Sequence, residues 1–270
     1  MTNRDNTNGR NSIVARSFSK YARGYDRHAR LQKQMAERLA SFLPNIMPDQ
    51  VLEIGCGTGL FTQHLLAHPL KQLILNDIAA DMVERLQSKL TLPRYCRVEV
   101  GNAETMEFQA VDLITANAVF QWFKLPLETL KIFNSYLRPD GELIFSTFGP
   151  ATLAEFRKTA SIESPASLLT FIKWKELIHE AGFSLRSSAL ETRKSFFSNT
   201  LGLLKNLQQI GAAPYRLTSS SDLRRLIKEY DENYSTKQGV YATWELFYFS
   251  AKINPKSVGH QANLDQSYFF

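Results

Sequence analysis

The sequence predicts an α/β fold: a doubly wound, mostly parallel seven-stranded sheet with a helical cap. Short β-rich runs alternate with helical stretches between residues 51 and 191, which is the pattern of a parallel sheet covered on both faces. A glycine-rich loop, Gly55-Cys56-Gly57-Thr58-Gly59, lies between the first strand and the next helix. Polar residues such as Asp77 and Asn117 end other strands, where ligands of such sheets bind.

Apolar spacing and chain breakers set the order of the elements. The head turns helical near Phe18 after a polar start, with an interruption expected at Gly24, and Pro44 and Pro48 end it. A turn is expected at 138–141. The predicted strands are 51–54, 72–76, 95–100, 111–115, 142–148, 183–190 and 240–253. The predicted parts are a tail and lid helix (1–47), a cofactor-binding core (48–191), a helical cap insert (192–239), the last core strand (240–253) and a tail without a recognisable pattern, for which disorder is one expectation (254–270).

Composition excludes several classes of protein. The chain has 270 residues, of which 44% are hydrophobic and 21% charged, as in ordinary globular proteins. Two cysteines without metal-type spacing predict neither a disulfide framework nor a metal site. No apolar run is long enough to cross a membrane. The N-terminus lacks the apolar segment of a secretory signal, so we expect a cytoplasmic protein.

The glycine loop indicates a particular kind of ligand. Its third glycine comes one residue too early for the dinucleotide fingerprint, and no Lys-Ser/Thr pair follows, as a P-loop would need. Glu53, just before the loop, disfavours a pyrophosphate and favours a cationic ligand. Asp77 can accept both hydroxyls of a ribose. Together these residues suit S-adenosylmethionine, whereas the alternative is a glycine turn that only packs the strand against the helix.

Several motifs resemble the Rossmann-type S-adenosylmethionine-dependent methyltransferases over residues 48–191. They are VLEIGCGTG, the aspartate that ends the second strand, GNAE at 101–104 and LRPDGELIFST at 137–147. Asn102 stands where the family often has Asp, and an amide can serve the adenine as well. The resemblance implies a Rossmann-like core and this cofactor-binding set: Glu53, Gly55, Gly57, Gly59, Asp77, Met82, Asn102, Ala103 and Asn117.

A narrower resemblance covers most of the chain. FSKYARGYDRHARLQ, NAVFQWF, FGPATLAEFR and LLKNLQQIGA are similar to the malonyl-[acyl-carrier protein] O-methyltransferases of biotin synthesis. This family methylates the free carboxyl of a malonyl thioester, so the resemblance implies malonyl-acyl carrier protein, or its coenzyme A thioester, as substrate. Ala151 replaces the usual glycine, which changes the backbone freedom near the substrate.

A carboxylate nucleophile needs no general base, because its ordinary pKa lies near 4. The catalytic set is therefore expected to position the substrate, and it comprises Tyr21, Tyr25 and Arg157. The Arg157 guanidinium matches a carboxylate; its alternative is an ion pair with a neighbouring glutamate. The two tyrosines lie four residues apart and alternatively only dock the head on the core. Phe120, Gln121 and Trp122 are expected to line the substrate pocket, the alternative being burial in the core.

Positive charge is concentrated in two segments. Residues 1–30 carry a net charge of +5 and residues 192–240 a net charge of +4, out of +6 for the chain. Such segments suit an acidic partner, although a solvated helical surface is the alternative. The cations expected to contact the carrier protein are Arg193, Lys194, Lys205, Arg224 and Arg225, together with Arg216 and Lys228.

Other functions stay open at this point. A methyltransferase acting on another small carboxylic acid or a quinone fits the sheet motifs equally well. A methyltransferase-like assembly factor of respiratory complex I resembles the same family. Charge alone suggests nucleic-acid binding, but no RNA-binding motif accompanies it. Nicotinamide binding is disfavoured by the glycine spacing. We expect no metal, membrane or nucleic-acid partner.

Overall fold

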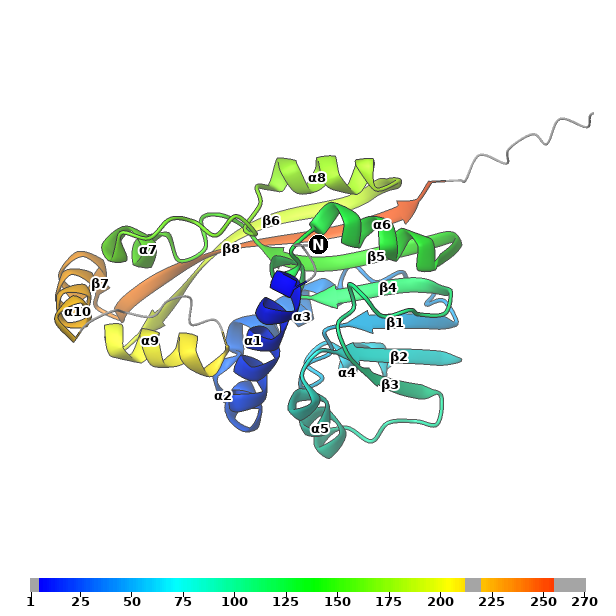
Figure 1. Cartoon of the computed structure of the whole chain (residues 1–270), viewed down its shortest axis with the longest axis horizontal. Helices are drawn as coiled ribbons and strands as arrows, with labels where there is room; N and C mark the ends of the chain where they lie inside the picture. The colour runs from blue at the N-terminus through cyan, green and yellow to red at the C-terminus, as the bar shows by residue number, and fades with distance from the viewer. Residues whose placement is uncertain (1–4, 212–219, 255–270) are drawn as a thin grey trace, which may run out of the picture.

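One mixed sheet dominates the computed structural model, which describes residues 5–211 and 220–254 (Figure 1). Arg216 and residues 255–270 of the expected tail lie outside this range. The strands of the described chain are β1 (Gln50–Ile54), β2 (Gln72–Asp77), β3 (Cys96–Val100), β4 (Val111–Asn117), β5 (Leu137–Phe148), β6 (Phe183–Phe197), β7 (Ser235–Thr236) and β8 (Gly239–Ile253). Their order across the sheet is β3-β2-β1-β4-β5-β8-β6, and β7 pairs with β8. The seven predicted strands are confirmed, and the two-residue β7 adds an eighth.

The first five strands run parallel, and β8 lies antiparallel between β5 and β6. Central strands β1 and β4 are almost wholly buried, because helices cover both faces of the sheet. Strand β1 pairs with β2 on one side and with β4 on the other. The chain direction across the sheet therefore reverses at β1, and the carboxyl ends of β1 and β4 flank the crevice in which such sheets bind ligands.

Helices complete the two layers. One buried cluster joins the head and the helices after β1 and β2 to one face, and a second joins the helices before and after β5 to the other. The doubly wound α/β class is thereby confirmed. The helices are α1 (Asp5–Tyr21), η1 (Ala22–Gly24), α2 (Tyr25–His28), α3 (Arg30–Ala40), α4 (Thr62–Leu65), α5 (Ala80–Lys89), η2 (Phe120–Trp122), α6 (Pro126–Tyr136), α7 (Ala154–Ala160), α8 (Phe171–Glu180), α9 (Thr200–Gln209) and α10 (Ser220–Tyr234).

The head is a broken helix rather than a tail followed by a lid. Helix α1 begins at Asp5, so most of the expected polar tail is helical. The expected interruption at Gly24 is present, because the chain passes through the 3-10 turn η1 before α2. A second break at Ala29 separates α2 from α3. These breaks allow the head to bend over the carboxyl ends of the strands.

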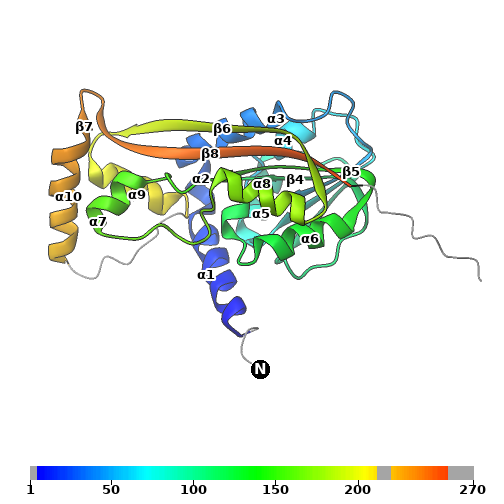
Figure 2. The same ribbon diagram turned by 90° about the horizontal axis from the view of Figure 1, so that it is seen from above.

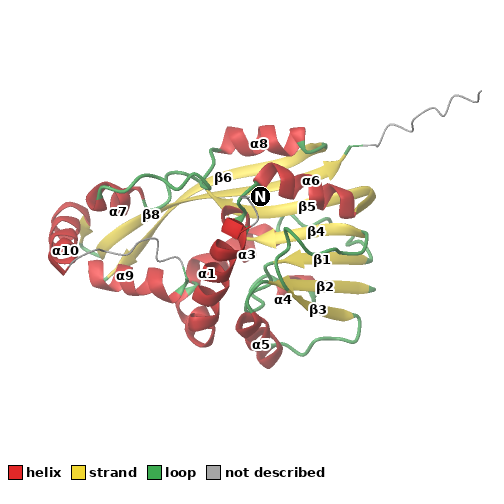
Figure 3. Cartoon of the chain, viewed as in Figure 1, coloured by secondary structure: helices red, strands yellow, loops and turns green. Residues whose placement is uncertain are grey.

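Two long strands carry the cap. Strands β6 and β8 pair along their full lengths and extend beyond the rest of the sheet. Helices α7, α9 and α10 gather on one side of this extension, away from β1 to β4 (Figures 2 and 3). The boundary expected at residue 192 falls inside β6, which continues to Phe197. Likewise, the turn expected at 138–141 lies within β5 as an irregularity at Asp140, whose φ is +66°.

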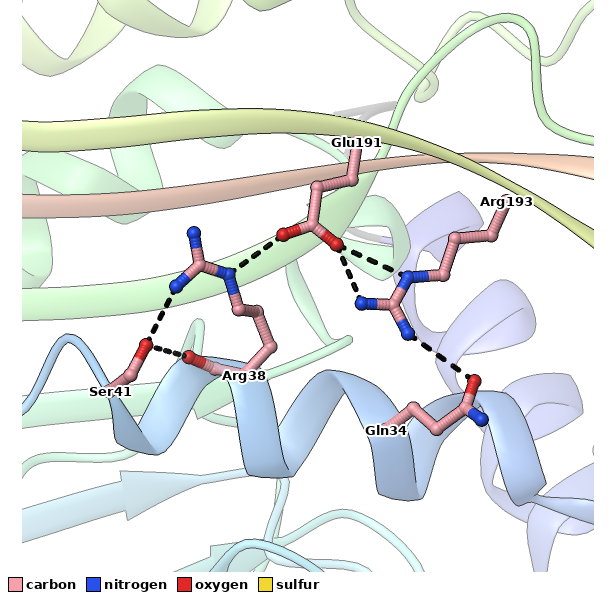
Figure 4. Close-up of polar contacts among 5 residues, drawn as sticks. All are labelled: Gln34, Arg38, Ser41, Glu191 and Arg193. Carbon is pink, nitrogen blue, oxygen red and sulfur yellow. Dashed lines mark hydrogen bonds and ion pairs between the residues drawn. The ribbon is translucent and has the colours of Figure 1, made fainter.

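A polar bridge joins the head to this extension. Glu191 on β6 accepts hydrogen bonds from Arg38 on α3 (2.7 Å) and from Arg193 (2.7 Å). Arg38 also donates to Ser41, and Arg193 to Gln34, so both ends of the bridge rest on or beside α3 (Figure 4). One carboxylate thus links α3 of the head to strand β6, which carries the cap.

Candidate active site

Two adjoining cavities open at the carboxyl ends of β1, β2 and β4. The inner cavity, of about 110 Å³, is lined by the glycine loop and the residues after β2, β3 and β4. The outer cavity, of about 660 Å³, lies between α1, η2, α7 and the end of α9. Both are lined by Val14, Phe18, Tyr25, Ala118 and Trp122, so these residues form the boundary where a ligand in one cavity meets a ligand in the other.

The glycine loop shapes the floor of the inner cavity. Gly57 has a φ of +52°, a conformation that glycine adopts readily. A Cβ at Gly57 would meet nothing within 4 Å, whereas one at Gly55 would lie 2.3 Å from Val119. Gly59 lines neither cavity, and its closeness to Leu90 (2.7 Å from a Cβ) shows that it serves packing. Gly55 and Gly57 therefore bring the backbone close to the space that a ligand would occupy.

Asp77 is held at the wall of the inner cavity by two backbone amides. Its carboxylate accepts hydrogen bonds from Gly57 N and Ala79 N, each at 2.8 Å. Burial raises its pKa to about 6, although the amide hydrogen bonds lower it. It is therefore mostly ionised at neutral pH and can accept hydroxyl hydrogen bonds.

Glu53 lies buried under the glycine loop and accepts a hydrogen bond from Thr62 Oγ1 at 2.7 Å. Burial raises its pKa to about 8; the Thr62 hydrogen bond opposes this rise and the charge of Asp77 adds to it. A small pocket beside the loop is lined by Glu53, Gln32 and Asn117. The carboxyl is thus mostly neutral at pH 7 until a positive group approaches it.

Residues after β2, β3 and β4 close the inner cavity. Asn102, Ala103 and Met82 line it, and Asn102 Oδ1 accepts from Glu104 N at 3.1 Å. Asn117 donates to Gln32 O (3.2 Å) and accepts from Ser146 Oγ (2.8 Å). Asn102 and Asn117 line the inner cavity together with Asp77, so they could contact a base attached to the ribose that Asp77 would bind.

The head reaches the glycine loop through Asp26. Thr58 Oγ1 donates to one oxygen of its carboxylate, and Lys89 Nζ donates to the other at 2.5 Å. Lys89 also donates to Thr58 O at 2.9 Å. Next to this contact, Tyr25 lines both cavities. Burial and the charge of Asp77 raise the Tyr25 pKa above its usual range, so its phenol remains a hydrogen-bond donor.

The outer cavity has a mostly apolar wall with a few polar groups. Trp122 packs edge-to-face on Phe18, and the centroids of the two rings lie 5.5 Å apart. Arg157 on α7 lines the cavity and donates to the carbonyl oxygens of Pro150 and Thr152. Gln32 Oε1 and Trp244 Nε1 are buried polar atoms without a hydrogen-bond partner among residues 5–211 and 220–254, and both side chains line this cavity. Such atoms are costly to leave unpaired, which favours a polar ligand beside them.

The chain has relatives of known type. A family model described as a methyltransferase domain matches residues 25–190. A malonyl-[acyl-carrier protein] O-methyltransferase from Paenibacillus sp. (strain JDR-2) is 30% identical over 269 residues, covering 88% of this chain and 97% of that protein. The chain belongs to the malonyl-[acyl-carrier protein] O-methyltransferase family. A relative named malonyl-[acyl-carrier protein] O-methyltransferase 2, from Ilyobacter polytropus, is 30% identical over 247 residues, which cover 87% of this chain and 95% of the relative.

A solved structure shares the fold. A crystal structure from Bacillus halodurans C-125, described as a methyltransferase, has a TM-score of 0.60 to this chain at 14% identity. It covers 82% of this chain and 99% of its own. The likeness confirms the Rossmann-like methyltransferase architecture predicted from the strand and helix order.

This methyltransferase depends on S-adenosylmethionine, and the residues of the inner cavity fit that cofactor. Gly57 leaves open space for it, and Asp77 is a suitable acceptor for its ribose hydroxyls. Its ammonium would meet the small pocket that holds Glu53 and the unpartnered Gln32 Oε1. Asn102 and Ala103 lie where its adenine would bind.

The structure does not bring every predicted site residue to a cavity. Phe120 is 1% exposed and stacks on Phe145 at 3.9 Å within the core. It lines neither cavity, and its interpretation as a substrate-pocket residue is wrong, because the turn η2 directs Gln121 and Trp122 to the cavity instead. Tyr21 also lines neither cavity and lies beside Lys20.

The predicted carrier-contact cations do not share one environment. Arg193 pairs with Glu191, and Lys194 lies 3.9 Å from the centre of the Tyr241 ring. Arg225 lies 3.8 Å from Asp222. Lys205 and Arg224 are exposed. Most of these side chains thus have partners within the chain.

Sequence reasoning missed three residues of the site. Asp26 and Gln32 belong to the head motif, but their roles depend on contacts with the glycine loop and with Asn117. Trp244 reaches the outer cavity from the last strand. Only the aspartate offered a signal, as a carboxylate within a basic segment.

No cluster of three or more potential metal ligands is found among residues 5–211 and 220–254. Within the same residues, no helix combines the length and apolar character of a membrane span.

Proposed function

We propose that the chain methylates the free carboxyl of a malonyl thioester carried by acyl carrier protein, an early step of biotin synthesis. Relatives at 30% identity that carry this name align over almost their whole length. The observation that carries the proposal is the outer cavity, which adjoins the inner one at Tyr25 and Trp122 and has Arg157 in its wall. The cytoplasmic location expected from the sequence stays part of this proposal.

The reaction needs positioning rather than proton transfer. One carboxylate oxygen forms a bond to the methyl carbon while the carbon–sulfur bond breaks, and the electron pair of that bond goes to sulfur. S-adenosylmethionine supplies the electrophilic methyl group. The carboxylate is already ionised at neutral pH, so the protein has to hold it in line and exclude water.

Arg157 is suited to hold the carboxylate. The carbonyl oxygens of Pro150 and Thr152 fix its guanidinium in the cavity wall. The fork-shaped donor then presents a planar cation to the substrate. The apolar wall around it, including Phe148 and Leu153, lowers the local dielectric and strengthens this attraction.

Intact-protein mass spectrometry tests the proposal. Malonyl-acyl carrier protein is incubated with the enzyme and S-adenosylmethionine, and acetyl-acyl carrier protein serves as the control. We expect the mass of one methyl group to be added to the malonyl form only. Cofactor binding without transfer to the malonyl form would contradict the proposal and favour the methylation of another small carboxylic acid or a quinone.

A further inference from the structure

The head helices present an exposed basic face that the reaction itself does not use. Between residues 12 and 36 the sequence has six Lys/Arg and a single acid, Asp26. That acid is engaged by Thr58 and Lys89. Arg16, Lys20 and Arg23 are exposed. Arg16 and Lys20 lie four residues apart in α1, on one side of that helix, and Arg23 follows in the turn η1.

Helix α9 adds a further cation to this face. Asn206 Nδ2 of α9 donates to His28 O at 3.2 Å, and a Cβ at Gly24 would lie 3.4 Å from Gln209 Oε1. Lys205 is exposed and precedes Gln209 by one helical turn, so it lies on the flank of α9 that meets the head. We define the head basic surface as Arg16, Lys20, Arg23 and Lys205.

The head basic surface borders the outer cavity. Ile13 and Ser17 of α1 line that cavity, and Arg16 and Lys20 each follow one of them by three residues. Ser17 Oγ also donates to Gly211 O at the end of α9 (3.4 Å). Ile13 is 61% exposed at this edge. A partner seated on these cations would have its bound acyl group next to the cavity.

The cap offers a weaker attraction to an acidic partner. Helix α10 contains four acids and three bases, so it is slightly acidic as a whole. Arg225 and Lys228 lie near acids of the same helix, at 3.8 and 3.9 Å, and Arg193 is paired with Glu191. Charges that are already compensated attract a partner less strongly than uncompensated ones.

We propose that the head basic surface is where the acidic helix of the acyl carrier protein docks. The inference rests on the proposed function, because it takes the carrier-bound malonyl group as substrate. Cations without an ion pair in the described part of the chain, such as these four, steer an acidic protein to the surface, and this attraction weakens as salt increases. The exposed Ile13 supplies an apolar contact at the edge of the cavity.

Charge reversal on two helices tests the inference. The variant R16E/K20E changes the head basic surface. The matched control with the same change of charge is R225E/K228E on α10, where both cations lie near acids of the same helix. The equilibrium Kd of labelled, unloaded carrier protein is measured by fluorescence anisotropy at low and high salt. We expect the head variant to raise the Kd about tenfold at low salt, with less difference at high salt, and the control to change it less than twofold.

Steady-state kinetics on two substrates complete the test. The head variant should raise KM for malonyl-acyl carrier protein. It should leave kcat and the KM for malonyl-pantetheine, which lacks the acidic carrier protein, within twofold of the unmodified enzyme. The inference would be overturned if the head variant left the Kd for the carrier protein unchanged. It would also be overturned if the control variant raised this Kd as much as the head variant does. Loss of binding to duplex DNA or anionic vesicles in the head variant, with carrier binding unchanged, would overturn it too. If neither malonyl substrate is methylated, the proposed function fails, and the carrier Kd still decides where the carrier docks.

Discussion

Glu53 illustrates how burial changes the role that a sequence suggests. Its position before the glycine loop predicts a carboxylate that attracts a cation. In the structure it is 1% exposed, and burial raises its pKa to about 8. The group is therefore mostly protonated at pH 7 without a ligand, and a bound cation lowers its pKa and releases a proton.

The variant Glu53→Gln tests this coupling. Because a cation binds better to the ionised group, the affinity of the unmodified enzyme for S-adenosylmethionine should gain strength as pH rises from 7 to 9. The ammonium of the ligand titrates in the same range, so the difference between enzymes is the readout. Isothermal titration calorimetry should show that the affinity of E53Q for S-adenosylmethionine gains less strength between pH 7 and 9 than that of the unmodified enzyme. Glu180→Gln, on the exposed end of α8, is the control; equal profiles for E53Q and the unmodified enzyme would contradict the account.

The local motifs predicted the cofactor residues better than the substrate residues. Gly57 and Asp77 are fixed by a short loop that joins neighbouring strands, and the structure places both at the inner cavity. Phe120 and Trp122 are two residues apart, and only the 3-10 geometry of η2 decides which of them faces the core. Gln32 lies far from Asn117 in sequence, so its contact requires the folded chain.

At the scale of elements, one carboxylate of the head binds both the glycine loop and a helix of the core. Asp26 of α2 contacts both the glycine loop and Lys89 of α5. The pair is partly buried, with about a quarter of each side chain exposed (27% and 28%). This contact keeps Tyr25 over the boundary of the two cavities.

Replacing Asp26 by Asn should loosen the head. The amide keeps one hydrogen bond to Thr58 but loses the ion pair with Lys89, so the cofactor should dissociate several-fold faster in a stopped-flow displacement experiment. A double-mutant cycle with Lys89→Ala should give a coupling energy of about 1 kcal/mol. Asp81→Asn, on an exposed turn of α5, should leave the dissociation rate unchanged. A coupling energy near zero would show that the contact does not hold the head.

The bridge between α3 and β6 has its own pH signature. Partial burial would raise the pKa of Glu191, but hydrogen bonds from Arg38 and Arg193 outweigh it and lower the pKa. This contribution to stability is present above the ordinary glutamate pKa and is lost as pH falls below it. Thermal unfolding of Glu191→Gln should show a loss of about 1 kcal/mol at pH 7 that shrinks toward pH 4. A loss that is the same at both pH values would contradict the electrostatic explanation.

Element boundaries followed the sequence closely in the core and less closely in the cap. Strands β1, β2 and β4 are short, mostly apolar runs, and the positions of β1 to β4 were predicted within a few residues. The extension of β6 to Phe197 was not predicted, because residues 192–239 were expected to form a helical cap insert. Pairing with β8 supports this polar strand, and such pairing is visible only in the folded chain.

At the scale of the whole molecule, the inner and the outer cavity are built by different parts of the chain. The inner cavity is built by loops that follow parallel strands, so its chemistry is readable from short motifs. The outer cavity is built by α1, α7, α9 and the last strand, which are far apart in the sequence. Substrate recognition therefore depends on how the head and the cap meet, and the resemblance to relatives was needed to predict it.

A crystal structure of the enzyme with S-adenosylhomocysteine and a non-hydrolysable malonyl-pantetheine analogue tests the account most directly. We expect the cofactor product in the inner cavity against Asp77 and the free carboxylate in the outer cavity beside Arg157. The pantetheine arm should leave between Ile13 and the end of α9, toward the head basic surface. A carboxylate bound away from Arg157, or an arm that leaves past α10, would contradict the account.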